Sequence, residues 1–67
     1  MVAMTFASLV RQHRAAKDWY QSDLAKKVGV SRETVSGIER GRINPSLSNA
    51  LSFARVLGFS LGDVTKV

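Results

Sequence analysis

Apolar residues along the chain recur at intervals of three and four positions, the spacing of the buried face of a helix. Near the start, such a stripe is formed by Phe6, Leu9, Val10 and His13. Together with capping and stop residues, this pattern predicts an all-α fold without strands. Five helices are expected, over about residues 5–17, 21–28, 32–40 and 47–57, and from residue 60 onward.

The most informative segment is residues 21–40, QSDLAKKVGVSRETVSGIER. Ala25 is small enough to let two helices cross closely, and Gly29 can supply the positive φ that a turn between them needs. The apolar contacts that would lock the two helices at a fixed angle are Leu24, Val28, Val30, Val35 and Ile38. This arrangement predicts a helix-turn-helix whose second helix lies in the major groove of DNA.

Composition limits the chain to one small domain, residues 1–67, with a single core. A hydrophobic fraction of 45% argues against disorder. No apolar run approaches the roughly 18 residues of a membrane span, so no membrane partner is expected. Because the sequence has no cysteine and no recognisable signal peptide, the expected location is the cytoplasm.

The net charge of +5 is unevenly distributed. Eight of the ten Lys and Arg residues lie within the first 42 residues, together with four of the five Asp and Glu residues. Charged helices are usually only solvated, so charge alone does not identify a partner. Since the basic half also contains the predicted helix-turn-helix, a polyanionic partner is favoured.

The sequence offers no convergent set of catalytic residues. One histidine and five carboxylates without metal-ligand or acid/base spacing leave no convergent chemical group. We therefore expect no enzyme activity, no metal, no cofactor and no small-molecule effector.

The stretches LAKKVGVSRETVSGIERGRINPS and ALSFARVLGFSL resemble the lambda-repressor/Cro-like (Xre) family of regulators. The likeness covers about residues 5–64 and is to short bacterial members that consist of the DNA-binding domain alone. It implies a compact five-helix lambda-repressor-like domain that binds double-stranded DNA at a two-fold symmetric operator. The function implied is a transcription regulator, most simply a dimeric repressor.

The resemblance also assigns roles to individual residues. It implies base contacts from the helix over 32–40, by Arg32, Glu33, Ser36 and Gly37. It implies phosphate contacts from Gln21, Ser31, Arg40, Arg42 and Asn44. In the family, the Glu that matches Glu39 pairs with an Arg of the first helix, which here is Arg14.

Gly37 leaves two interpretations open, because Gly costs about 1 kcal/mol relative to Ala inside a helix. Either the backbone approaches the groove floor or a thymine methyl there, or an exposed position has drifted to glycine.

Dimerisation is expected in the nearly uncharged carboxy-terminal half, over about residues 56–67. The apolar residues proposed for it are Val56, Phe59, Leu61, Val64 and Val67. The alternative is that this segment only caps the core of the monomer. Two other functions remain open: an antitoxin or restriction-system controller with the same domain, and a protein-interaction adaptor that no longer binds DNA.

Overall fold

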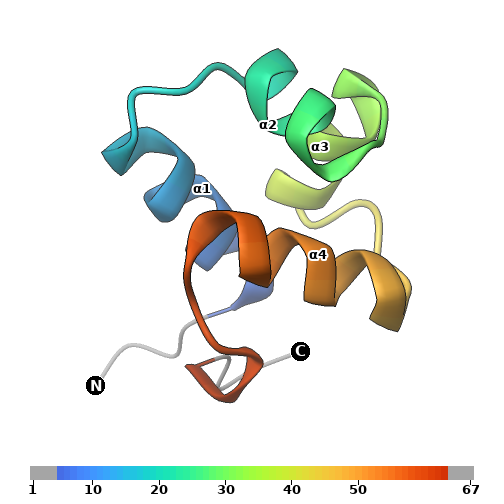
Figure 1. Cartoon of the computed structure of the whole chain (residues 1–67). Helices are drawn as coiled ribbons and strands as arrows, with labels where there is room; N and C mark the ends of the chain where they lie inside the picture. The colour runs from blue at the N-terminus through green and yellow to red at the C-terminus, as the bar shows by residue number, and fades with distance from the viewer. Residues whose placement is uncertain (1–4, 64–67) are drawn as a thin grey trace.

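Four α-helices and one short 3-10 helix make up residues 5–63, the part of the chain that the computed structural model describes. The elements are α1 (Phe6–Ala16), α2 (Gln21–Val28), α3 (Arg32–Glu39), α4 (Leu47–Leu57) and η1 (Leu61–Asp63). Helices α2 and α3 form a corner, and α1 and α4 pack against this pair (Figure 1). Since residues 5–63 contain no strand element, the all-α prediction is confirmed.

The prediction of a fifth α-helix is wrong. After α4, within the described part of the chain, only the three-residue 3-10 helix η1 forms. Ser60 Oγ accepts from Gly62 N at 3.1 Å, two residues later, at the start of this short element.

The other helices begin and end within one residue of the predicted positions because local caps fix them. Thr5 Oγ1 accepts from Ser8 N at 3.1 Å, and Ser46 Oγ accepts from Asn49 N at 3.1 Å. Helix α2 stops at Gly29, whose φ of 90° lies in the left-handed region. This conformation turns the chain sharply from α2 into α3.

The core joins all four α-helices. The side chains that fix α2 against α3 are buried as predicted: Leu24, Ala25, Val35 and Ile38. Val10 of α1 and Phe53 of α4 are fully buried in the same cluster. Phe6 packs edge-on against Phe53, with ring centres 6.0 Å apart. The helix-turn-helix is thus held by a scaffold that extends beyond its own residues.

A buried ion pair connects α1 to the end of α3. Arg14 Nε and Nη2 donate to the two carboxylate oxygens of Glu39, at 2.7 and 3.0 Å. Arg14 Nη1 donates to the Trp19 carbonyl at 2.7 Å, and Arg11 Nη1 donates to the Glu39 carbonyl at 2.7 Å. The hydrogen bond that Arg14 donates to Glu39 raises the pKa of Arg14 above its ordinary value, although burial acts in the opposite direction.

The turn between α1 and α2 is fixed by polar contacts of its own. Asp18 has a positive φ of 57°, a conformation that aspartate tolerates better than most residues. Tyr20 supplies no side-chain cap, but Asp23 Oδ2 accepts from Tyr20 N at 2.8 Å. The Lys27 ammonium lies 4.8 Å from the centre of the half-buried Trp19 ring. These contacts set where α2 begins.

We predict that Glu39→Ala strongly destabilises the domain. Glu39 is 3% exposed, and its removal leaves the Arg14 guanidinium without its partner. Breaking a buried pair in this way costs about 3–5 kcal/mol. Thermal and urea unfolding followed by circular dichroism would measure the loss. Glu33→Ala is the matched control, because Glu33 is exposed on the same helix. Equal melting temperatures for Glu39→Ala and the wild-type chain would contradict this role of the pair.

Candidate nucleic-acid interface

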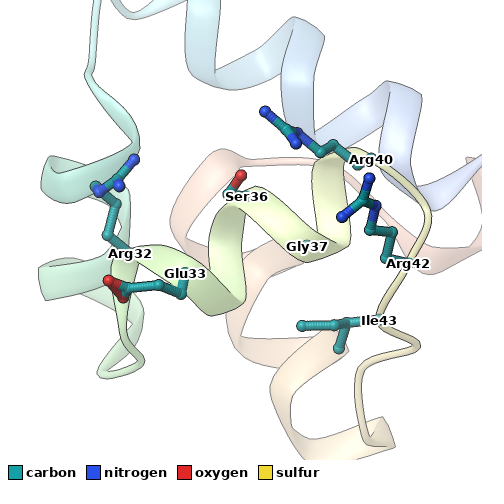
Figure 2. Close-up of a pocket in the computed structure, with 7 residues that line it drawn as sticks. All are labelled: Arg32, Glu33, Ser36, Gly37, Arg40, Arg42 and Ile43. Carbon is teal, nitrogen blue, oxygen red and sulfur yellow. The ribbon is translucent and has the colours of Figure 1, made fainter.

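Helix α3 has one face buried in the core and one face exposed to solvent. Val35, Ile38 and Glu39 are buried against α1 and α2, whereas Arg32 and Glu33 are exposed in the first turn. Two neighbouring residues of α3 thus place a guanidinium and a carboxylate in solvent at the same end of the helix (Figure 2).

The exposed side of α3 and the loop that follows it enclose a shallow hollow (Figure 2). We call it the α3 hollow, and its lining residues are Arg32, Glu33, Ser36, Gly37, Arg40, Arg42 and Ile43. Three arginines stand there against a single glutamate. The hollow brings together all four predicted base-contacting residues with two of those predicted to contact phosphate. Such a cationic surface beside an exposed helix suits the edge of a DNA groove.

The amino-terminal end of α3 is fixed by Ser31. Its Oγ accepts from Thr34 N at 3.1 Å and lies 2.8 Å from Thr34 Oγ1. This cap satisfies one of the backbone N–H groups that an α-helix leaves unpaired in its first turn. The capping bond fixes the turn from which Arg32 and Glu33 project.

Gln21, at the start of α2, lies between the buried ion pair and α3. Gln21 Nε2 donates to Glu39 Oε1 at 3.3 Å, and Arg32 Nη1 is 3.5 Å from Gln21 Oε1. The structure therefore brings Gln21 beside Arg32, a proximity that their separation in sequence does not reveal.

The loop after α3 carries the remaining predicted phosphate ligands. The side chains of Arg40 and Arg42 are exposed and line the α3 hollow. Asn44 is also exposed, but it lines a second hollow, between this loop and the amino-terminal end of α1. Arg42 N and Ile43 N both donate to the Gly37 carbonyl, at 2.8 and 3.2 Å. The loop is thereby held against the last turn of α3.

Gly37 does not lie on the exposed face of α3, so that expectation is wrong. The residue is buried beneath Ile43. A Cβ built on Gly37 would lie 2.7 Å from Ile43 Cγ1 and closer still to Cδ1. Gly37 is therefore not an exposed position that has drifted to glycine, and close packing of the loop gives a structural reason for glycine there.

Ile43 is the residue of this site that sequence reasoning missed. Its side chain is 41% exposed, and it lies among the charged residues of the α3 hollow. The available signal was an aliphatic, β-branched residue in the otherwise polar loop RGRINPS.

The residues predicted for a dimer surface mostly face the core. Phe59 is only 9% exposed, and its ring lies 5.9 Å from that of Phe6. Val56 and Leu61 are half-buried and pack against the same cluster. Val64 and Val67 lie outside the described residues. Within residues 5–63, this segment covers the core of the monomer, which was the alternative interpretation.

The described residues offer little for other chemistry. No helix among them is both long enough and apolar enough to cross a membrane. Within the same range, no three His, Asp or Glu side chains gather closely enough to hold a metal ion.

Comparison with known proteins decides the family. A sequence model of the helix-turn-helix family matches residues 10–64. An HTH-type transcriptional regulator of Methanocaldococcus jannaschii is 42% identical over 55 residues, which cover 82% of this chain and 83% of the relative. This chain belongs to the lambda-repressor-like helix-turn-helix family. The protein is accordingly a DNA-binding transcription regulator.

Two solved structures agree with this assignment. The restriction-modification controller protein C.AhdI of Aeromonas hydrophila is similar to the regulator with a TM-score of 0.79 and 38% identity, covering 87% of this chain and 88% of that one. The DNA-binding domain of the P22 C2 repressor gives a TM-score of 0.81 and 30% identity, covering 90% of this chain and 79% of that one.

We predict that Ser31→Ala destabilises the regulator by about 1 kcal/mol, because α3 loses its amino-terminal cap. Urea unfolding at equilibrium would measure the change. Ser36→Ala is the control on the same helix, since Ser36 stands inside α3, where alanine is the better helix former. If both variants had the same midpoint, the cap would not stabilise α3.

Proposed function

We propose that this regulator is a repressor that inserts α3 into the major groove of a two-fold symmetric operator, as a homodimer. The observation that carries the proposal is the α3 hollow, where Arg32 and Glu33 are exposed at one end of the helix and Arg40 and Arg42 at the other (Figure 2). In this arrangement α3 reaches base edges while the loop after it follows the phosphate backbone.

We assign the contacts with base edges to residues in the first turns of α3. Arg32 can donate two hydrogen bonds to guanine O6 and N7, and Glu33 can accept one from cytosine N4. The half-buried Ser36, one turn further along, contributes its hydroxyl on the same side of the helix. Gln21 beside Arg32 supports this assignment, because its side chain limits where the guanidinium can go.

We assign phosphate binding to the ends of α2 and α3 and to the loop after α3. Arg40 and Arg42 supply positive charge at the carboxy-terminal end of α3. Ser31, at the amino-terminal end of α3, and Gln21, at the start of α2, supply polar groups. Asn44, on the far side of the loop, would reach a phosphate farther along the backbone. Such contacts fix register and affinity but carry no sequence information.

A homodimer follows from the operator geometry, in which half-sites lie about 10 base pairs apart. Two copies that each carry a net charge of +5 repel each other least where charge is sparse. Residues 43–62 hold a single charged side chain, Arg55. In that stretch Leu47 and Leu51, one turn apart on α4, are 71% and 47% exposed. We place the contact between copies there.

Likeness to C.AhdI favours a second candidate function, control of a restriction-modification system. Both functions use the same DNA contacts. They differ in the location of the operator, which would then precede genes for a nuclease and a methyltransferase.

We predict that Arg32 contributes to sequence preference, whereas Arg42 contributes to affinity for DNA of any sequence. Duplexes selected from a randomised pool by the wild-type regulator should share a two-fold symmetric motif. Arg32→Ala should lose about 1–3 kcal/mol on that motif and little on random DNA. Arg42→Ala should weaken both about equally and reduce the salt slope by about one. Lys17→Ala, at an exposed lysine directly after α1 to which the proposal assigns no DNA contact, is the control with no expected loss.

A pool that yields no enriched motif would contradict sequence-specific binding. If Arg42→Ala changed the motif but not the affinity for random DNA, its assignment to phosphate would fail.

We predict that Leu51→Glu separates the copies while each stays folded, because Leu51 is exposed in the monomer. Sedimentation of the proteins without DNA should show twice 7.3 kDa for the wild-type chain and 7.3 kDa for the variant. Gln12→Glu on α1, also exposed, adds the same charge elsewhere and should keep the dimer. A Leu51→Glu variant that still sedimented as a dimer would exclude this surface.

A further inference from the structure

One aliphatic side chain stands exposed among the charged groups of the α3 hollow. Ile43 is 41% exposed there, with Arg42 next to it in the chain and Arg40 three residues earlier. We propose that Ile43 reads a thymine of the operator by packing against the 5-methyl group of the base. The inference rests on the proposed insertion of α3 into the major groove, and it names a base that this site selects.

The position of Ile43 is determined by the helix, although the residue belongs to the loop. The N–H groups of Arg42 and Ile43 share the Gly37 carbonyl as acceptor, which holds this part of the loop against the carboxy-terminal turn of α3. From there the Ile43 side chain extends back toward the helix beside Gly37 (Figure 2). The loop thus adds an apolar group to the surface that α3 presents.

The missing side chain at position 37 makes this placement possible. Any Cβ there would overlap the Cγ1 and Cδ1 atoms of Ile43 and push the side chain away from the helix. A β-branched residue also has few χ1 rotamers, so little freedom is lost when a base contacts it. Gly37 and Ile43 together form a rigid apolar contact point.

The chemistry of the groove selects the ligand. Among the groups that base pairs present in the major groove, the thymine 5-methyl is the apolar one, and the others are hydrogen-bond donors and acceptors. An isoleucine placed against those polar groups would desolvate them without offering a hydrogen bond. Burial of one methyl group is worth about 0.8 kcal/mol, which corresponds to about a fourfold change in affinity.

The test uses the operator motif obtained from the selected pool, with each thymine replaced singly by uracil, which lacks the methyl group. The wild-type regulator should lose about fourfold in affinity at one thymine of each half-site. Ile43→Ala should bind the thymine and uracil duplexes equally at that position. Ile43→Val should retain part of the difference. Gln12→Ala, at an exposed position of α1 outside both the α3 hollow and the proposed contact between copies, should keep the full loss.

Three results would overturn the inference: uracil tolerated at every position by the wild-type chain, a motif without thymine, or an undiminished uracil effect in Ile43→Ala. Melting curves of the variants check that they fold, and the exposed loop position predicts that they do. A pool without any motif would contradict the insertion of α3 itself, together with this inference. A clear motif with replaceable thymines would contradict only the role of Ile43.

Discussion

The carboxylate of Glu39 is the group on which the arrangement of the first three helices depends. It is almost completely buried, yet both of its oxygens accept hydrogen bonds, from Arg14 and from Gln21. Helix α3 has only eight residues, too few for a stable isolated helix. Its direction is therefore set by what holds its ends, and this carboxylate joins its last turn to α1 and α2. The face that α3 presents to solvent follows from that connection.

Arginine is the residue type that this connection requires at position 14. Its planar guanidinium donates in three directions at once, to both oxygens of Glu39 and to the Trp19 carbonyl. The ammonium group of lysine is compact and lacks this fixed fork of donors, so it could not join α3 and the turn before α2 in the same way. The ion pair thus positions Gln21 as well, since α2 begins two residues after Trp19.

The sequence predicted the helix-turn-helix well because its signals are local. Ser31 caps α3 and Gly29 ends α2 through contacts within a few residues, which a sequence pattern contains. The contact of Ile43 with Gly37 could not be predicted, since it depends on how the loop folds back on α3. The burial of Phe59 against the core of its own chain was not predicted for a similar reason. An apolar residue near the end of a chain can cover its own core or another copy, and only the tertiary structure distinguishes the two.

The two sides of α3 are subject to different constraints. Arg32 and Glu33 are exposed and lie outside the buried core, so the fold should persist when they are replaced. Val35 and Ile38 have the opposite role, because they fill the core and do not face solvent. Gly37 is buried and also lines the α3 hollow, so both constraints act on it. A side chain there would displace Ile43 and so alter the packing of the loop and the shape of the reading surface together. Under the proposed contact of Ile43 with DNA, specificity would therefore not be confined to the exposed residues of α3 but would extend to one buried glycine and the loop that covers it.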